Sequence, residues 1–291
     1  MSENLRELTI EDQEQVDILC ATVWEGNDYV PAVFPRWVST LDSHTLGLFD
    51  NKELIAIGNV ERTEGTTIGW VQGLRVKDTH RGKGHARSVT LALSELARVK
   101  GITTLWYATS SRNIASITVA EKTGFQRANS TGYFRLYKPY PPHSKPSPSI
   151  VPIQVDPERI YELLQINPDL VPEDKFPLAW HFDYKTLEGL NRLTSRAINK
   201  VVIDEAGIPQ ALYCVTERER KEEKTSAYTV FATDRSVFVD IMSRMIDESQ
   251  SAGVDRAVFF LGPNTTEWAQ DLGYVSEEFI DRRFLLYEKK L

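Results

Sequence analysis

Six of the fifteen residues from Lys138 to Pro152 are proline, in the run KPYPPHSKPSPSIVP. Proline has no backbone N–H and fixes φ, so this stretch cannot form the interior of a helix or a central strand. We expect an extended linker at residues 139–152. It divides the 291-residue chain into two halves, residues 1–138 and 153–291, and each is long enough for one domain.

The composition favours a soluble protein that binds neither nucleic acid nor membrane. Apolar residues make up 41% of the chain, and the net charge is −7. The two cysteines, Cys20 and Cys214, and the five histidines show no metal-site spacing, so we expect no metal. The polar N-terminus does not resemble a signal peptide, and no apolar run is long enough to span a bilayer. We therefore expect a cytoplasmic location.

Hydrophobic periodicity in the first half predicts strands and helices in a mixed order. The order is typical of an α/β (α+β mixed) fold with a mostly antiparallel sheet flanked by helices. Strands are predicted at residues 5–9, 44–50, 53–62, 66–76, 103–110 and 133–138, and helices at 11–24, 84–100 and 111–124.

The second half repeats this order at an offset of 149 to 152 residues. The segments KGITTLWYA, KTGF and GYFRLYK correspond to AGVDRAVFF, DLGY and RRFLLYEK. Several matches in the same order indicate an internal duplication, and two unrelated α/β domains are the alternative.

The run DTHRGKGHARSV, residues 78–89, lies between a predicted strand and a predicted helix. A helix N-terminus presents unpaired N–H groups, and the glycines let a ligand approach the backbone closely. Arg81 and Lys83 add positive charge, so the loop predicts a site for a di- or polyphosphate. It has neither the Walker A spacing nor the Rossmann spacing.

This R-G-x-G-x-A loop resembles motif A of the GNAT (GCN5-related) N-acetyltransferases, and Asn113, Ser116 and KTGF at 122–125 resemble the motif that follows it. The resemblance covers residues 5–138 and implies tandem GNAT-like domains with acetyl-CoA as cosubstrate. It implies that the backbone of Leu74 and Val76 binds the pantetheine arm. The other implied cofactor contacts are Arg81, Gly82, Lys83, Gly84, His85 and Ala86 at the pyrophosphate, with Asn113 and Ser116 nearby.

The second half lacks both loop glycines. Asp234 would repel a phosphate there, and Phe238 stands opposite Ala86. We expect residues 153–291 to be a degenerate GNAT-like domain that binds no CoA and walls the acceptor site.

Two positions depart from the catalytic pattern of the family. Gln72 stands where the resemblance implies an acidic base, and Ala120 stands where it implies a tyrosine that protonates the thiolate. We expect catalysis by proximity, with water carrying the proton. Without a strong base, an α-amine with a pKa of about 8 is a better acceptor than a lysine with a pKa of about 10.4.

The segment WEGNDYVPAVFPRW, residues 24–37, resembles the group around vertebrate histidine N-acetyltransferase in its E-G-x-D-Y-[VL]-P pattern. That resemblance implies a small amino acid or a similar metabolite as acceptor. Asp28 and Glu25 are candidates to hold the ammonium or to act as base through water, and Tyr29 to line the pocket or donate to the carbonyl. The alternatives are a turn-stabilising Asp28 and a packed Tyr29. Glu61 is a weaker candidate base.

The expected function is acetyl transfer from acetyl-CoA to the amine of a small metabolite, for which a free amino acid is one candidate. The alternatives are a protein or peptide N-acetyltransferase and a non-catalytic acyl-CoA-binding sensor. We expect either a monomer that is a pseudo-dimer of its two halves or a homodimer.

Overall fold

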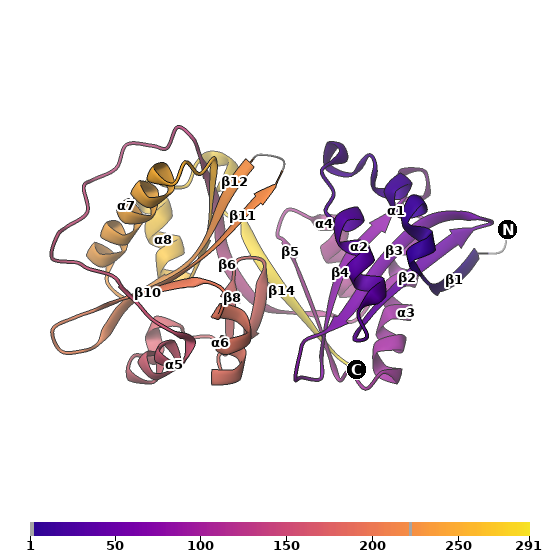
Figure 1. The fold of residues 1–291 in the computed structure, drawn as a ribbon, viewed down its shortest axis with the longest axis horizontal. Helices are drawn as coiled ribbons and strands as arrows, with labels where there is room; N and C mark the ends of the chain where they lie inside the picture. Colours follow the sequence, from indigo (N-terminus) through magenta and orange to yellow (C-terminus); the bar gives the residue numbers. More distant parts are fainter. Residues whose placement is uncertain (1–2, 221–222) are drawn as a thin grey trace. The chain divides into compact units, whose positions relative to one another are not determined.

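The computed structural model describes residues 3–220 and 223–291, apart from the side chains of Glu3, Trp24 and Glu25. Its packing defines two compact units (Figure 1). Unit 1 comprises Met1–Thr109, Asn113–Ala128 and Leu286–Leu291, and unit 2 comprises Ser110–Arg112 and Asn129–Leu285.

Unit 1 contains one mixed sheet with helices on both faces, in the strand order β1-β2-β3-β4-β5-β14. Only the β4–β5 pair among the first five strands is parallel. Its strands are β1 (Glu3–Glu7), β2 (Ser43–Asp50), β3 (Glu53–Arg62), β4 (Ile68–Val76), β5 (Thr104–Ser110), the start of β6 (Gln126–Tyr137) and the end of β14 (Arg283–Lys290); its α-helices are α1 (Gln13–Cys20), α2 (Val30–Ser39), α3 (His85–Val99) and α4 (Ile114–Lys122).

Successive residues of β3 face opposite sides of this sheet. Ile57 packs in one cluster with Val16 of α1 and Phe34 of α2. Gly58 faces α3, where an added Cβ would lie 2.9 Å from Leu93. Helices α1 and α2 therefore cover one face of the unit 1 sheet and α3 covers the other.

Helix α2 forms although Pro35 lies inside it. An internal proline leaves the carbonyl four residues earlier without its usual N–H donor. Here the carbonyl of Pro31 accepts a hydrogen bond from Nε2 of Gln13, at 3.2 Å, on the neighbouring α1. This side-chain donor satisfies the carbonyl, so the proline is tolerated.

The chain's last residues complete unit 1. Trp106 of β5 donates from Nε1 to the Glu288 carboxylate at 2.8 Å, and Leu291 N donates to Thr103 O at 3.0 Å. The sequence patterns gave no sign that residues 286–291 would pack with unit 1 while 129–137 pack with unit 2. The division of the sequence at 139–152 remains a prediction.

Unit 2 also contains a mixed sheet, in the order β14-β6-β13-β12-β11-β10-β7, and a separate β8–β9 hairpin. The β12–β13 pair is parallel. Its remaining strands are β7 (Ile153–Gln154), β8 (Lys175–Leu178), β9 (His181–Tyr184), β10 (Ile198–Ile203), β11 (Pro209–Arg220), β12 (Glu223–Ala232) and β13 (Arg256–Leu261); its α-helices are α5 (Pro157–Ile166), α6 (Leu187–Thr194), α7 (Arg235–Ser251) and α8 (Pro263–Asp271).

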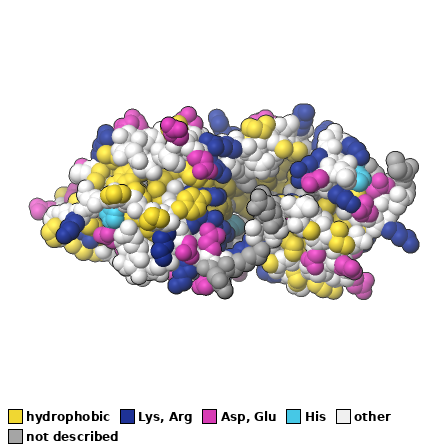
Figure 2. Space-filling view, turned by 90° about the horizontal axis from the view of Figure 1, so that it is seen from above, with side chains coloured by type: hydrophobic (Ala, Val, Ile, Leu, Met, Phe, Trp, Pro, Cys, Tyr) yellow, Lys and Arg dark blue, Asp and Glu magenta, His cyan; other side chains and the backbone are white. Residues whose placement is uncertain are grey.

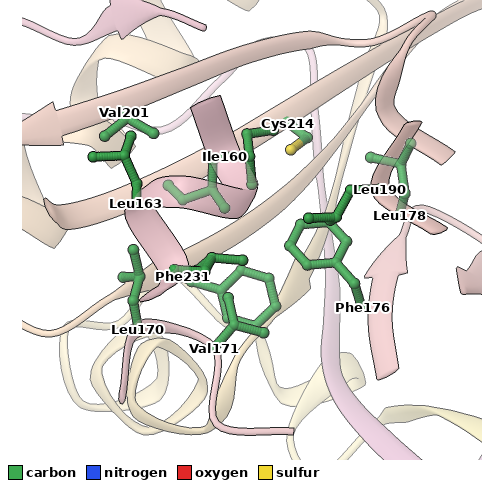
Figure 3. Packing of buried hydrophobic residues seen from close by; sticks show 12 residues of the cluster. Ile160, Leu163, Leu170, Val171, Phe176, Leu178, Leu190, Val201, Cys214 and Phe231 are labelled. Carbon is green, nitrogen blue, oxygen red and sulfur yellow. The ribbon is translucent and has the colours of Figure 1, made fainter. Parts of the chain in front are cut away.

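The unit 2 sheet is also covered on both faces. On one face, Leu163 of α5 and Leu190 of α6 pack in a fully buried cluster with Cys214 of β11 (Figure 3). On the other face, the Tyr228 hydroxyl of β12 donates to Met245 O of α7 at 3.2 Å. The two units have similar orders of helices and strands. This confirms the predicted fold class, in which helices flank mixed, mostly antiparallel sheets.

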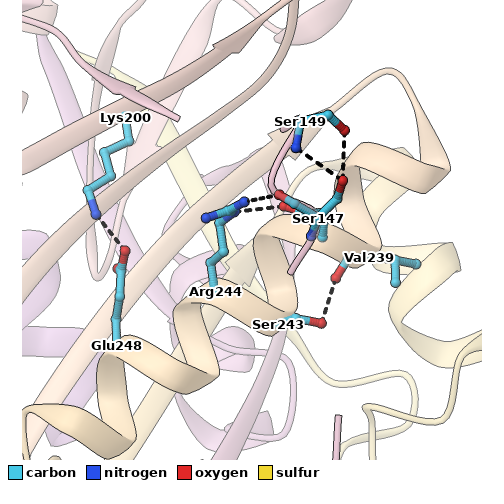
Figure 4. Close-up of polar contacts among 8 residues, drawn as sticks. Ser147, Ser149, Lys200, Val239, Ser243, Arg244 and Glu248 are labelled. Carbon is cyan, nitrogen blue, oxygen red and sulfur yellow. Dashed lines mark hydrogen bonds and ion pairs between the residues drawn. The ribbon is translucent and has the colours of Figure 1, made fainter. Parts of the chain in front are cut away.

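The proline-rich segment has no helix or strand, as its composition predicts, but it is fixed to α7. His143 Nε2 and the Asp247 carboxylate lie 2.7 Å apart. The carbonyl of Ser147 accepts a hydrogen bond from Arg244 (Figure 4). The segment is therefore part of unit 2.

Basic and acidic side chains are interspersed over the face of the molecule drawn in Figure 2. Within residues 3–220 and 223–291, no three His, Cys, Asp or Glu side chains lie together as a metal site. Among the same residues, no helix has both the length and the apolar character needed to cross a bilayer.

Candidate active site

Strands β4 and β5 of unit 1 pair only at their beginning. Their register runs from Ile68–Thr104 to Trp70–Trp106, which is three pairs, although β4 continues to Val76. In unit 2 the corresponding strands stay paired for six positions, from Thr225–Arg256 to Val230–Leu261. The second part of β4 therefore presents its backbone groups to a gap on the β5 side, and β12 does not.

The glycine loop lies at the end of this gap. Gly82 and Gly84 have φ of +77° and +91°, and an added Cβ at either would meet no atom within 4 Å. Gly84 is the N-cap of α3 and has no side chain to bond the first-turn amides. Arg81 and Lys83 are exposed, although Arg81 also pairs with Asp78 at 2.6 Å. The open space at the two glycines and the glycine N-cap of α3 fit a phosphate-bearing ligand.

In unit 2 the corresponding helix N-terminus, at the start of α7, is capped by a side chain of the protein itself. The Asp234 carboxylate accepts hydrogen bonds from Ser236 N at 2.8 Å and Val237 N at 3.0 Å, so it caps α7. The hydrogen bond from the Ser236 side chain and those from the two amides lower the pKa of Asp234, so this cap is ionised at neutral pH. Phe238 is fully buried against Trp268. An anion cannot use these amides while the carboxylate holds them.

The other predicted cofactor residues have clear structural positions. Leu74 and Val76 lie in β4, where Val76 pairs with Ala56. Asn113 caps α4 by accepting from Ser116 N at 3.3 Å. His85 begins α3, is buried, and lies 6.0 Å ring to ring from His80. Leu74, Val76 and the loop thus follow the open side of β4 in chain order, and Asn113 and Ser116 begin the helix after β5.

Asp28 is buried in an ion pair with Arg75. Arg75 donates from Nε to Oδ2 at 2.6 Å and from Nη2 to Oδ1 at 2.7 Å, and Oδ1 also accepts from Val30 N at 3.1 Å. Burial raises the pKa of Asp28, but the hydrogen bonds and charge of Arg75 outweigh it, so the pKa is lowered. A carboxylate held in this way is a weak base, and its contacts stabilise the start of α2.

Tyr29 lies beside this ion pair. The Arg75 guanidinium is 5.4 Å from the centre of the Tyr29 ring, and the ring meets Trp37 edge to face at 6.3 Å. Burial raises the pKa of Tyr29, so its hydroxyl stays protonated and can donate. Glu25, the third catalytic candidate, has a side chain outside the described part of the structure.

A second polar cluster lies on the same face of the sheet. Arg36 of α2 donates to both oxygens of Glu61 on β3, at 2.5 and 2.9 Å. Gln72 of β4 donates from Nε2 to Glu61 at 3.1 Å. Glu61 therefore supplies a carboxylate beside the position where Gln72 replaces the expected acid. Nothing in the sequence singled out Arg36, because its partner lies 25 residues away.

The place of the expected tyrosine is taken by Ala120, which is buried in α4. Tyr107 of β5 packs edge to face on Phe125 in the same unit. Burial raises the pKa of Tyr107 to about 12, and the Tyr29 and Arg75 groups also act on it electrostatically. The sequence does not indicate a role for this hydroxyl, because Tyr107 lies within an ordinary strand pattern.

Residues 45–134, from β2 into β6, match the family described as FR47-like protein. The fold is similar along 99% of the chain to a GCN5-related N-acetyltransferase from Sphaerobacter thermophilus (TM-score 0.62, 13% identity, 95% of that chain). It is equally similar to a tandem GNAT protein from the clavulanic acid biosynthesis pathway (TM-score 0.61, 12% identity, 99% of this chain and 98% of that one).

A third similar structure is a candidate acetyltransferase from Thermoplasma acidophilum (TM-score 0.60, 15% identity, 99% of this chain and 100% of that one). The comparison with curated proteins gave no match. The first half of the chain therefore matches the FR47-like family over residues 45–134, and the fold along the whole chain is that of tandem GNAT proteins.

Proposed function

We propose that this protein transfers an acetyl group from acetyl-CoA, bound by unit 1, to the amine of a small metabolite, with free amino acids as the first candidates. The observation that carries the proposal is the gap between β4 and β5, which opens after three residue pairs and leads to the N-terminus of α3, where the N-cap is Gly84. Acetyl-CoA supplies the thioester whose carbonyl carbon the amine attacks.

The chain offers matching groups for each part of that cosubstrate. The backbone of Leu74 and Val76 is available to an extended amide-bearing arm along β4. The amides from Gly82 to Ala86 would hold the pyrophosphate, with Arg81 and Lys83 adding charge. His85, Asn113 and Ser116 complete the proposed cofactor residues at the starts of α3 and α4.

The cluster of Arg36, Glu61 and Gln72 supports an amino-acid acceptor. A free amino acid carries a carboxylate and an ammonium on one carbon, and this cluster places a guanidinium beside a carboxylate. Arg36 would bind the carboxylate of the acceptor, and Glu61 would take the proton from its ammonium. Gln72 would keep the Glu61 side chain in place.

The residues around Asp28 have a supporting role in this proposal. Asp28 fixes Arg75, and Arg75 in turn lies over the Tyr29 ring. Tyr29 would line the acceptor pocket and donate its hydroxyl to the carbonyl, and Tyr107 is a second protonated hydroxyl in the same unit. Unit 2, with its closed β12–β13 pair, would bind no CoA.

The experiment is an assay of CoA thiol release from acetyl-CoA against free amino acids, diamines and short peptides. Release with one or a few free amino acids, and not with lysine-containing peptides, is expected. Release with peptides alone would indicate that the acceptor is a protein or peptide and not a free amino acid. Acetyl-CoA binding without release on any amine would overturn the enzyme proposal in favour of a sensor.

A further inference from the structure

Three strands of unit 2, β11, β13 and β6, place arginine side chains on one face of the sheet. Arg218 of β11 lies opposite Thr225, Thr225 lies opposite Arg256, and Arg256 lies opposite Tyr137. Residues directly opposite one another in neighbouring strands share a face. Arg135, two residues before Tyr137 on β6, lies on that same face.

Helices α5 and α6 cover this same face of the unit 2 sheet, but only near the start of β11. Leu212 and Cys214 pack there in the core cluster, and they alternate in phase with Arg218. Arg218 lies beyond this cluster and is exposed. On this face, β11 is therefore apolar and buried at Leu212 and Cys214, and cationic and exposed at Arg218.

Aromatic rings hold these guanidinium groups in place. The Arg218 guanidinium lies 4.3 Å from the centre of the Trp180 ring. Arg282 and Arg135 lie 5.0 and 5.3 Å from the centre of the Tyr133 ring. Trp180 and Tyr133 each contact Phe260 edge to face, at 5.3 Å, so the two groups of arginines are joined through one buried ring.

Acidic partners balance only part of this charge. Arg256 lies 3.3 Å from Glu223, and Arg282 lies 4.0 Å from Glu278, at the limit of an ion pair. Among the described residues, no carboxylate lies within ion-pair distance of Arg218 or Arg135.

The pKa values of these arginines reflect the excess of positive charge on this face. Although Arg218 is exposed as a residue, partial desolvation of its guanidinium and the nearby guanidinium of Arg256 lower its pKa. Burial also lowers the pKa of Arg282, and the charge of Arg135 adds to that effect. These arginines repel one another, and a bound anion would relieve the repulsion.

We propose that the arginine face, defined by Arg135, Arg218, Arg256 and Arg282, binds a small organic anion through its carboxylate or phosphate groups. Guanidinium groups pair bidentately with both kinds of oxyanion. The Trp180 ring lies against the Arg218 guanidinium and leaves its N–H edges able to donate, whereas Arg135 donates from Nε to the Tyr133 hydroxyl and from Nη1 to the Tyr137 hydroxyl. The proposal does not depend on acetyl transfer, since every residue of the face belongs to unit 2.

The test is calorimetric titration of sodium phosphate and of sodium succinate into the full-length protein at constant ionic strength. Arg218→Gln and Arg282→Gln each remove one guanidinium of the face. Arg159→Gln is the control, because Arg159 is an exposed arginine on α5 of the same unit and pairs with Glu162. Circular dichroism checks that each variant is folded.

We expect saturable binding of at least one probe, weakened about tenfold or more in Arg218→Gln and Arg282→Gln and unchanged in Arg159→Gln. Binding of phosphate alone identifies a phosphorylated ligand, and binding of succinate alone identifies a carboxylate. Absence of saturable binding, or binding that both test variants retain, would overturn the proposal. Equal weakening in Arg159→Gln would also overturn it, since the effect would then be one of net charge.

Discussion

Arg75 on β4 donates hydrogen bonds to both carboxylate oxygens of Asp28, at 2.6 and 2.7 Å, and the Asp28 side chain is 1% exposed. Substitution of Asp28 by Asn leaves the Arg75 guanidinium buried without its counter-charge. We expect the free energy of unfolding at pH 7 to fall by about 3 kcal/mol. Urea unfolding measures this, and a change below about 1 kcal/mol would contradict the described ion pair.

The same pair predicts a pH dependence. Because the pKa of Asp28 is lowered in the folded protein, its contribution is present above the unfolded pKa of about 3.9 and is lost as pH falls through the folded value. The stability difference between wild type and Asp28→Asn should therefore be constant from pH 7 to about 5 and narrow below about 4. A difference that narrows between pH 7 and 5 would be inconsistent with the lowered pKa.

Gly73 sets the contact between β4 and α2. Its φ is +69°, and an added Cβ would lie 2.5 Å from the Trp37 ring. Gly73→Ala should lower the free energy of unfolding by about 2–4 kcal/mol, from backbone strain and overpacking together. Gly207→Ala is the matched control, since Gly207 has φ of +83° and open space around it, and should cost about 1 kcal/mol. Equal costs would mean that the Trp37 contact contributes nothing.

Glu61→Gln tests the proposed base. We expect kcat at pH 7 to fall about 100-fold, with an unchanged KM for acetyl-CoA. The deficit should shrink as pH rises toward the pKa of the acceptor amine, because a neutral amine needs no base. Glu95→Gln, on the exposed side of α3, should have wild-type kinetics. A deficit that is independent of pH would instead indicate a structural role for Glu61.

Because residues 286–291 pack in unit 1 and residues 129–137 in unit 2, the structure makes a prediction about fragments. A fragment of residues 1–138 lacks residues 286–291, which belong to unit 1 and include Glu288, the partner of Trp106 on β5. We expect it to unfold without a cooperative transition, and a peptide of residues 283–291 to restore one. Cooperative unfolding of the fragment alone would support the sequence boundary at 138 as a true domain limit.

The loop at residues 78–86 could be identified from sequence because its chemistry is local. Glycines, basic residues and the start of a helix stand next to one another in the chain. The capping role of Asp234 follows the same logic, since an aspartate before a helix bonds its first amides. From the sequence we predicted only that Asp234 would repel a phosphate in the second half, and the structure shows that its carboxylate also caps α7.

The acceptor side depends on long-range packing instead. Asp28 and Arg75 are 47 residues apart, and Arg36 and Glu61 are 25 apart. Only the register of β3 with β4, and the packing of α2 on both, brings these pairs together. Residue patterns do not indicate such contacts, so the sequence predicts Asp28 as a candidate ammonium ligand or base, or as a turn-stabilising residue, and does not indicate its ion pair with Arg75.

Titration of acetyl-CoA into the intact chain by calorimetry tests the central claim most directly. We predict one site per chain, abolished by Gly84→Glu and retained in Gly101→Glu. Gly101 has a φ of +76° and open surroundings like Gly84, so the control introduces the same strain and charge away from the loop. Two sites per chain, or one site that survives Gly84→Glu, would contradict the assignment of acetyl-CoA to the glycine loop of unit 1.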